Sequence, residues 1–356
     1  MRLPFMRPRP APPPSAVPAG TARAVVFVEP RRVELREVTL PPAGPLDIVV
    51  DVTTSAISAG TERWALLGLR PDVSWPCIPG YLAVGRVARA ADAAPHGLRT
   101  GDRVCFLAAK CPDGYGANWM CAHLSRAVVS CDPAAYMPGA DLPYWLPVPD
   151  PVPDAEAAYA GLAGVAMMGV TMSSPRPGET VAVFGLGMVG QFSAQLAQIA
   201  GARVFAADLS AERARLAREC GIEHAQSSEP AAIEAAAAAF APGGFDVVID
   251  TTGSGPALNA EVKVLKPHGR FVLQGWYPGM TELNLHEFTV RHARALFPCG
   301  VRGGDVARSL ALMASGRLRC APLITNRWRP EDAPQAYDAL LSGAPASMGQ
   351  VFDWQP

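Results

Sequence analysis

The sequence predicts an α/β protein with a β-rich first part and a doubly wound parallel sheet in its second part. Up to about residue 149, short apolar runs alternate with turns rich in Pro and Gly, as in small β-rich domains. Beyond the Pro-rich passage 143–153, strand-like runs alternate with helical patterns, which is typical of a parallel sheet. A chain of 356 residues has the length for two domains.

The individual elements follow from these runs. In the first part, we expect strands over residues 24–27, 32–37, 47–53, 83–88 and 103–107. In the second part, a helix over 154–171 precedes strands 181–184, 203–207, 247–250 and 270–273, which alternate with helices 191–200, 210–220, 230–240 and 256–265. The tail after about residue 305 contains two amphipathic helices and a β-like run over 348–354, and we expect it to return to the first part.

A glycine-rich turn joins the strand 181–184 to the helix that follows it. The turn reads Gly185-Leu186-Gly187-Met188-Val189-Gly190, a GxGxxG sequence. The first glycine permits the tight turn, the second keeps side-chain atoms away from a pyrophosphate, and the third lets helix and strand pack closely. In this strand–turn–helix setting the motif predicts a dinucleotide site at the helix N-terminus, and the alternative is a structural turn in an ordinary α/β fold.

An acidic residue selects between the two nicotinamide dinucleotides. Asp208 ends the second strand of the parallel sheet, eighteen residues after Gly190. A carboxylate there accepts hydrogen bonds from ribose hydroxyls and repels a 2′-phosphate, so the expected cofactor is NAD(H). Arg213 is close enough along the chain to meet a phosphate or stack on adenine, which keeps NADP(H) open as the alternative.

Composition excludes several classes of function. The formal net charge is −1 and the basic residues are scattered, so neither nucleic acid nor an anionic membrane surface is an expected partner. No apolar run approaches the ~20 residues that cross a bilayer. The eight cysteines, in a chain whose Pro- and Arg-rich start lacks a secretory signal, are expected to be reduced thiols of a cytoplasmic protein.

From about Ala24 to Asp353, the sequence motifs and their order along the chain resemble those of the medium-chain dehydrogenase/reductase superfamily. The resemblance implies a GroES-like catalytic domain, a Rossmann domain for NAD, a cleft between them, and hydride transfer to or from a nicotinamide on a small-molecule substrate. It also implies a homodimer, joined through the region 295–300. The segments that carry it are 50–52, 57–62, 79–87, 101–104, 116–119, 181–190, 245–253 and 269–275.

The resemblance divides the chain into four parts. Residues 1–22 form a Pro/Arg-rich disordered extension, 23–153 the GroES-like catalytic domain, 154–300 the Rossmann domain, and 301–356 the return to the catalytic domain. The Rossmann domain is therefore an insertion between two parts of the catalytic domain.

Two departures from the zinc-dependent branch indicate a zinc-free enzyme. Where that branch has a Cys, this chain has Ser58 or Ala59, and in place of a His-Glu pair it has Tyr81-Leu82. Hydroxyl oxygens do not replace the thiolate and imidazole ligands of a catalytic zinc. Cys111, Cys121 and Cys131 are too widely spaced for a structural zinc lobe, so no metal is expected. The patterns 57–62 and 79–81 further resemble the branch that includes hydroxyethyl bacteriochlorophyllide dehydrogenase.

Without a metal, side chains must stabilise the alkoxide-like oxygen of the reacting alcohol. The resemblance places Ser58, Thr61, Glu62 and Tyr81 in loops that line the cleft. Glu62, if partly buried, is a candidate acid/base with a raised pKa, and the Tyr81 hydroxyl is a candidate partner of the substrate oxygen. The alternatives are that Glu62 caps a helix or pairs with Arg63 and that Tyr81 only packs.

Residues at strand ends complete the expected site, because ligands bind at the carboxyl ends of parallel strands. Thr251, Thr252 and Gly253 follow one strand, and Gln274 and Gly275 end the next, so they are expected near the ribose and nicotinamide. Three aromatic side chains are expected to form apolar walls of the substrate pocket: Trp64, Trp276 and Tyr277.

Three functions are therefore weighed. The first is a zinc-independent, NAD(H)-dependent oxidoreductase that interconverts an alcohol and a ketone or aldehyde on a small or medium hydroxylated metabolite. The second is an NAD(P)H-dependent reductase of conjugated C=C bonds in enones or quinones, which the acid at 208 disfavours. The third is a dinucleotide-binding protein without turnover. The sequence does not choose the substrate or the direction of reaction.

Overall fold

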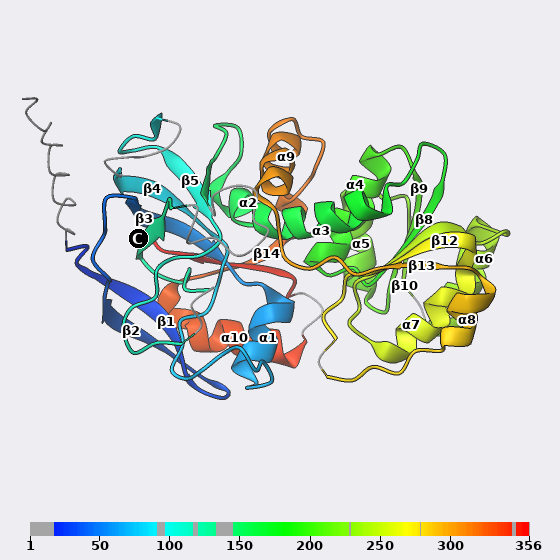
Figure 1. The fold of residues 1–356 in the computed structure, drawn as a ribbon, viewed down its shortest axis with the longest axis horizontal. Helices are drawn as coiled ribbons and strands as arrows, with labels where there is room; N and C mark the ends of the chain where they lie inside the picture. Colours follow the sequence, from blue (N-terminus) through cyan, green and yellow to red (C-terminus); the bar gives the residue numbers. More distant parts are fainter. Residues whose placement is uncertain are drawn as a thin grey trace, which may run out of the picture.

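A computed structural model describes residues 18–90, 97–116, 120–132, 145–227, 229–277, 279–343 and 347–355. Most of the expected N-terminal extension and positions 117–119 of the segment 116–119 lie outside this described part. Figure 1 shows two lobes. We call them the mixed-sheet lobe, which contains the C-terminus, and the parallel-sheet lobe.

The mixed-sheet lobe is built on a seven-stranded sheet in the order β14-β15-β3-β4-β5-β7, with β6 also paired to β3. A separate hairpin, β1-β2, and the helices α1 and α10 complete the lobe (Figure 1). The bounds are β1 Thr21–Glu29, β2 Arg32–Thr39, β3 Asp47–Ala56, α1 Ala59–Leu66, β4 Ala83–Arg89, β5 Arg103–Phe106, β6 Arg126–Ser130, β7 Trp145–Pro147, β14 Ile324–Trp328, α10 Ala333–Ser342 and β15 Gly349–Asp353.

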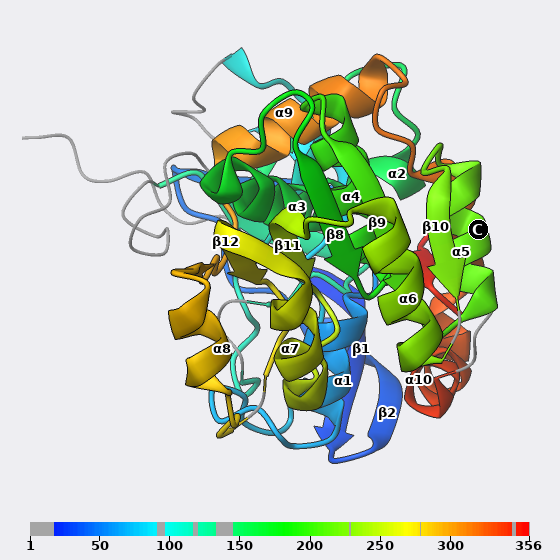
Figure 2. The same ribbon diagram turned by 90° about the vertical axis from the view of Figure 1, so that its right-hand side faces the viewer.

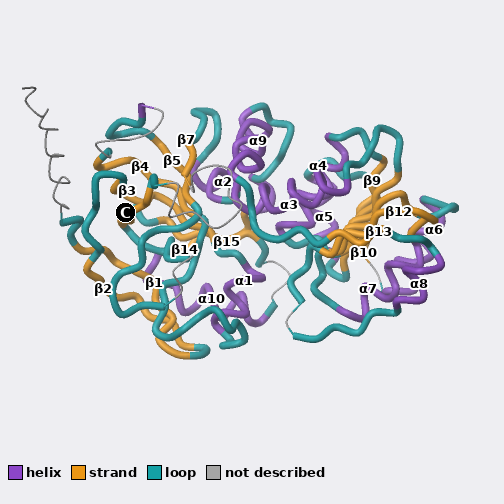
Figure 3. The backbone as a smooth tube through the Cα atoms, viewed as in Figure 1, coloured by secondary structure: helices purple, strands orange, loops and turns teal. Residues whose placement is uncertain are grey.

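The parallel-sheet lobe is built on six parallel strands in the order β10-β9-β8-β11-β12-β13. Helices lie on both faces of this sheet, as Figures 2 and 3 show. The bounds are α2 Asp154–Ala158, α3 Ala160–Ser173, β8 Thr180–Phe184, α4 Met188–Ile199, β9 Arg203–Asp208, α5 Ala211–Glu219, β10 His224–Ser227, α6 Pro230–Phe240, β11 Phe245–Asp250, α7 Gly255–Glu261, β12 Leu265–Leu273, α8 Leu285–Val290, β13 Arg294–Leu296 and α9 Gly303–Ala314. The predicted fold class, a β-rich part and a doubly wound parallel sheet, is confirmed.

The strand order explains where the site lies. The chain enters at β8, adds β9 and β10 on one side, and then crosses to the other side to add β11, β12 and β13. Loops that follow β8 and β11 therefore leave the sheet in opposite directions, and parallel α/β sheets bind their ligands at such a point. The glycine-rich turn follows β8, and residues 251–253 follow β11.

The two faces of the parallel sheet are both buried, which is why its strands read as continuous apolar runs. On β8, Val181 and Val183 join the core that also contains α3 and α4, whereas Ala182 and Phe184 join the core under α6 and α7. The first of these cores continues into the mixed-sheet lobe through Leu82. The two lobes therefore share a hydrophobic core through α2 and α3, which lie between them (Figure 1).

The glycines of α3 serve this packing. A Cβ on Gly161 would lie 2.4 Å from Leu82 Cδ2, and one on Gly169 would lie 2.3 Å from Gln274 Oε1. The apolar run 157–172 spans the end of α2, Tyr159 and most of α3, and most of its residues are buried. Within the described residues, none of the helices has the length and apolarity that a bilayer crossing requires.

Several expected boundaries were wrong. The predicted helix 154–171 is divided at Tyr159, α4 begins three residues earlier than predicted because Gly187 is its N-cap, and β12 begins at Leu265 rather than Arg270. The predicted elements did not include the helices α1 and α8 or the strands β6, β7, β10, β13 and β14. These elements are short, and the strands among them span three to five residues, too few to show a period.

The C-terminal strand β15 pairs antiparallel with β3, so the tail returns to the first sheet. Phe352 on β15 is fully buried between the rings of His123 and Tyr337, at centroid distances of 5.1 and 6.2 Å. Its partners come from distant parts of the chain. The aromatic ring of Phe352 is therefore one of the contacts that tie the tail to the mixed-sheet lobe.

We predict that Phe352→Ala lowers the free energy of unfolding by about 3–5 kcal/mol, because it leaves a cavity in a closed core. Urea denaturation followed by circular dichroism measures the change. The control is Met280→Ala, at a fully exposed side chain, which should change it by less than about 0.5 kcal/mol. Equal stability of the two variants would contradict the placement of β15.

Candidate active site

The glycine-rich turn between β8 and α4 has the backbone geometry of a phosphate cradle. Gly185 has φ +84°, a conformation that L side chains rarely adopt, and a Cβ on Gly190 would lie 1.9 Å from the Gly185 carbonyl oxygen. A Cβ on Gly187 would instead point into open space, with no atom within 4 Å. Two glycines thus shape the turn, and the third leaves room beside it.

This room lies at the N-terminus of α4, a helix of twelve residues that begins at Met188. Gly187 is the N-cap and makes no side-chain hydrogen bond, so the first N–H groups of the helix, those of Met188 and Val189 among them, face the turn without a side-chain cap. An anion is favoured there by these donors and by the helix dipole. The residues therefore fit the pyrophosphate of a dinucleotide.

Asp208 closes the adenosine side of the turn. Its Oδ2 accepts a hydrogen bond from the N–H of Leu186 at 2.6 Å, and its Oδ1 accepts one from the N–H of Ser210 at 2.8 Å. Arg213 approaches Oδ2 at 3.5 Å and is one-third exposed, whereas Asp208 is 8% exposed. Oδ1 keeps a second lone pair, so the acid can still accept from a ribose hydroxyl.

The loops after β11 and β12 contact the glycine-rich turn. Thr251 Oγ1 donates to the Gly185 carbonyl at 2.8 Å, and a Cβ on Gly275 would lie 2.6 Å from the N atom of Gly253. The hydroxyl of Thr252 instead donates to Asp250 Oδ1 at 2.6 Å. The predicted residues 251–253 and 275 are therefore brought together with the turn at one edge of the sheet.

The side chain of Gln274 does not lie where the sequence predicts it. Its side chain does not extend towards this loop, because Nε2 donates to the Val165 carbonyl of α3 at 2.5 Å and Oε1 lies beside Gly169 and Ser193. Only the backbone of Gln274 remains at the strand end. The side chain instead fixes β12 against α3.

Tyr277 also differs from the prediction that it forms an apolar pocket wall. Its hydroxyl donates to Asp250 Oδ2, and the buried carboxyl group of Glu261 on α7 interacts electrostatically with Asp250. Burial, and then the neighbouring Asp250 charge, raise the pKa of Glu261 well above its ordinary value. Burial also raises the pKa of Asp250. Sequence reasoning missed this buried acid pair, because the two residues are eleven positions apart on different elements.

The mixed-sheet lobe contributes a pair of hydroxyl groups. Ser58 is the N-cap of α1 and is buried, and its Oγ lies 2.8 Å from the hydroxyl of Tyr81 in the loop before β4. Burial raises the pKa of the Tyr81 phenol, and hydrogen bonds to Ser58 and Thr61 partly offset this. Three of the four predicted catalytic residues therefore lie within one hydrogen-bonded group.

The fourth, Glu62, is separated from that group by its own hydrogen bonds. Its side chain is fully buried, with Oε1 accepting from the Ser58 N–H at 2.7 Å and Oε2 contacting His123 Nε2 at 3.0 Å and the Tyr337 hydroxyl at 2.5 Å. It forms no ion pair with Arg63. A carboxylate so enclosed has no oxygen to present to a substrate, which corrects the expectation that Glu62 exchanges protons directly.

The other two residues predicted to form apolar walls of the pocket, Trp276 and Trp64, differ in their exposure and contacts. Trp276 is 46% exposed, and the guanidinium of Arg70 lies 4.6 Å from its ring centroid. Trp64 is half-buried on α1. Sequence reasoning missed Arg70, which no motif marks.

The residues at the expected catalytic zinc position do not fit a zinc ion. Leu82 is fully buried in the shared core, next to Gly161 and Leu107, and its neighbour Tyr81 is bonded to Ser58. Across the described ranges, no cluster of three His, Cys, Asp or Glu side chains is arranged to hold a metal. All eight cysteines are free thiols, and of the three spaced by ten residues Cys111 and Cys121 interact with each other.

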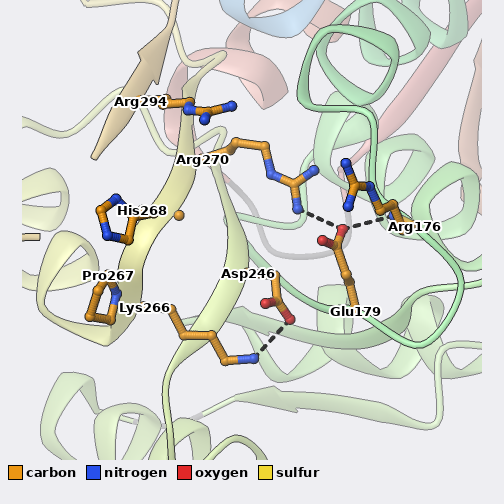
Figure 4. Close-up of a pocket in the computed structure, with 9 residues that line it drawn as sticks. Arg176, Glu179, Asp246, Lys266, Pro267, His268, Arg270 and Arg294 are labelled. Atoms are coloured by element: carbon orange, nitrogen blue, oxygen red, sulfur yellow. Dashed lines mark hydrogen bonds and ion pairs between the residues drawn. The ribbon is translucent and has the colours of Figure 1, made fainter. Parts of the chain in front are cut away.

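A separate hollow lies at the opposite edge of the parallel sheet, near the amino ends of its strands (Figure 4). Two ion pairs cross it, Arg270 with Glu179 at 2.5 Å and Lys266 with Asp246 at 2.9 Å. The strands run away from this edge towards the glycine-rich turn. The hollow is therefore not part of the candidate active site.

We predict that Glu261→Gln stabilises the protein as the pH rises. A carboxyl with a raised pKa holds its proton in the folded state and loses it on unfolding, so the wild type loses stability above the ordinary value of 4.5, by up to about 1.4 kcal/mol per pH unit. Glutamine has no proton to lose, and its Tm should exceed that of the wild type at pH 8 but not at pH 4.5. The control is Glu234→Gln at an exposed position of α6.

Residues 188–315 match the family model for zinc-binding dehydrogenases. That segment runs from α4 to α9 and excludes Ser58 and Tyr81-Leu82, so the match carries no information on zinc ligands in this chain.

Three similar proteins cover almost the whole chain. L-threonine 3-dehydrogenase of Mesorhizobium japonicum is 27% identical, with 90% of this chain and 95% of that protein aligned. The 2-desacetyl-2-hydroxyethyl bacteriochlorophyllide A dehydrogenase of Cereibacter sphaeroides is 28% identical, with 93% and 98% aligned. A structure from Sinorhizobium meliloti 1021, described as a zinc-binding dehydrogenase bound to NADP, has a TM-score of 0.78 at 23% identity and covers 94% of this chain and 99% of its own.

The relatives include the branch that the sequence resembles, and the shared fold extends over both lobes. The chain is therefore an oxidoreductase of the alcohol dehydrogenase type, and the predicted resemblance is confirmed. This protein belongs to the medium-chain dehydrogenase/reductase superfamily.

Proposed function

We propose that the protein is a zinc-independent, NAD(H)-dependent oxidoreductase that interconverts an alcohol and a ketone or aldehyde on a small or medium hydroxylated metabolite. The observation that carries the proposal is the hydrogen bond of 2.8 Å between Ser58 Oγ and the Tyr81 hydroxyl. The relatives are dehydrogenases, and this pair provides two hydroxyl groups beside the cleft where zinc-dependent relatives of the branch place ligands.

In this proposal residues 154–300, which make up most of the parallel-sheet lobe, hold the cofactor, and 23–153 with 301–356 form the catalytic domain. The glycine-rich turn and the α4 N-terminus bind the pyrophosphate, Asp208 binds the adenosine ribose, and the loop 251–253 with Gly275 lines the nicotinamide end. When bound, the nicotinamide supplies or accepts a hydride. The protein must then manage the proton and the charge on the substrate oxygen.

Tyr81 and Ser58 perform that task. Because burial raises the pKa of Tyr81, the phenol holds its proton at neutral pH and can donate a hydrogen bond to a carbonyl oxygen. In the reduction direction the phenol proton passes to the developing alkoxide, and Ser58 Oγ, at 2.8 Å, stabilises the phenolate that remains. In oxidation the step reverses: the phenolate form of Tyr81, whose proton has passed to solvent, takes the alcohol proton.

Glu62 acts on this pair through Ser58. Its Oε1 accepts the Ser58 N–H, which sets the start of α1 and therefore the position of Ser58 Oγ. The carboxylate is a positioning residue, and the phenol is the proton donor.

Zinc independence is supported by what occupies the expected ligand positions. Leu82 is an apolar core residue, and the hydroxyls of Ser58 and Tyr81 satisfy each other. Hydroxyl groups do not form the N/S donor set of a catalytic zinc.

Two further expectations are part of the proposal. A homodimer is supported by β13, which is the edge strand of the parallel sheet and is followed by Phe297 with 65% of its surface exposed. A cytoplasmic location is supported by eight free thiols, seven of them at least partly buried.

A substrate screen with Tyr81→Phe tests the chemistry. Alcohols, polyols, enones and quinones are assayed with each dinucleotide, and Tyr81→Phe should lower kcat on the best alcohol by about 10²-fold, because the phenyl ring has no proton to transfer. NADH affinity should be unchanged in fluorescence titration. Tyr115→Phe, outside the site, is the control.

The outcomes separate the alternatives. Turnover of enones or quinones but not alcohols would favour the C=C reductase, and tight NADH binding with no turnover would favour the binding protein. Stoichiometric zinc, lost together with activity on chelation, would exclude the metal-free reaction.

Asp208→Ser tests the choice of cofactor. Loss of the carboxylate removes the hydrogen bonds to the ribose and the repulsion of a 2′-phosphate. It also removes the partner of Arg213 at this position, so that this side chain can pair with the 2′-phosphate. The ratio of kcat/KM with NADH to that with NADPH should fall by about 10-fold or more. Glu212→Gln, on α5 nearby, should leave the ratio unchanged, and an unaltered protein that uses NADPH equally well would contradict the assignment.

A further inference from the structure

An arginine from the mixed-sheet lobe reaches the other lobe. Arg70 follows α1, and its guanidinium lies 4.6 Å from the ring centroid of Trp276, which follows β12. Only 9% of the Arg70 side chain is exposed. Trp276 is held against the cofactor loop, because a Cβ on Gly253 would lie 2.7 Å from its carbonyl oxygen. The contact therefore places a positive charge between the two lobes, at the nicotinamide end of the site.

An ion pair and an aromatic ring, both from the described residues, help to orient this guanidinium. Asp72 accepts from its Nε at 3.0 Å and from its Nη2 at 2.7 Å, a bidentate pair, and the Trp276 ring lies under its plane. The two charges of the ion pair have different surroundings. The Asp72 side chain is 45% exposed and is screened by water, whereas the guanidinium is enclosed between the lobes, where a charge acts more strongly.

The same guanidinium acts on the reacting hydroxyl group. Burial is the main influence on the pKa of Tyr81 and raises it, and the positive charge of Arg70 is among the smaller influences that lower it. Arg70 is therefore within electrostatic range of the phenol oxygen. The nearby buried acids Glu62 and Asp250 are enclosed by hydrogen bonds to Ser58, His123 and Tyr337 or to Thr252 and Tyr277.

We infer that Arg70 is a specificity-determining residue that recognises a carboxylate on the substrate, so that the reacting alcohol is a hydroxy acid. The inference rests on the proposed function, because it places the alcohol oxygen at Tyr81. A guanidinium is planar and pairs with a carboxylate through two parallel hydrogen bonds. Stacking on Trp276 holds the plane in place before the substrate binds, which lowers the entropy lost on binding.

Anion binding is measured first, without turnover. Malonate and its neutral analogue malonamide are titrated by calorimetry into the NADH complex at constant ionic strength. Malonate should bind at least about 10-fold more tightly, and Arg70→Met should remove the difference, because the charge-assisted hydrogen bonds are lost. The control Arg215→Met removes a similar bidentate arginine–acid pair on α5, with Glu212, and should leave the difference intact.

Asp72→Asn separates recognition from a structural role. The substitution removes the competing carboxylate but keeps a hydrogen-bonding side chain, so malonate should bind more tightly than to the wild type, opposite to the effect of Arg70→Met. If the ion pair served only to hold the loop, both variants would weaken binding. That result, or equal binding of malonate and malonamide to the wild type, would overturn the inference.

Turnover then distinguishes this inference from the proposed function. A hydroxy acid should be oxidised with a kcat/KM about 10²-fold above that of its amide, and Arg70→Met should bring the two together. Turnover of neutral alcohols without preference for acids overturns the role of Arg70 and leaves the proposed function standing. Anion binding through Arg70 without turnover of any alcohol would support the role of Arg70 and overturn the proposed function.

Discussion

The arrangement of the segments around Ser58 and Tyr81 depends on the buried carboxylate of Glu62. Its oxygens meet the N–H of Ser58, the N-cap of α1, the imidazole of His123 before β6 and the hydroxyl of Tyr337 on α10. A buried charge is tolerated only when its hydrogen bonds are made, so each of these segments must be in place for the others to be stable. Beyond His123 the chain of bonds continues to Ser55, whose Oγ lies 2.7 Å from Nδ1 and accepts from Trp354 Nε1 at 2.8 Å.

Both ring nitrogens of His123 are engaged: Nδ1 lies 2.7 Å from Ser55 Oγ, which accepts from the Trp354 indole, and Nε2 lies 3.0 Å from Glu62 Oε2. The hydroxyls of Ser58 and Tyr81 are thus held by a rigid support, which is what a proton donor needs if it is to meet a substrate oxygen at a fixed place.

Much of this organisation can be read from the chain, but the direction of side chains cannot. The glycine-rich turn and the acid at the end of β9 are local patterns, so both the elements and their order follow from the sequence. Whether Gln274 extends to the loop or to α3, and whether Glu62 opens to the cleft, depends on residues up to 275 positions away. Arg70 belongs to no motif, and its position becomes evident only when both lobes are present.

The return of β15 to the first sheet has a consequence for the order in which the protein forms during synthesis. Every strand of the parallel sheet leaves the ribosome before β14 and β15, so the nucleotide-binding lobe can complete its sheet while β3 still lacks its partner on one side. Until Tyr337 and Trp354 emerge, Glu62 and Ser55 also lack theirs. The half of the molecule that is translated first is therefore the half that matures last.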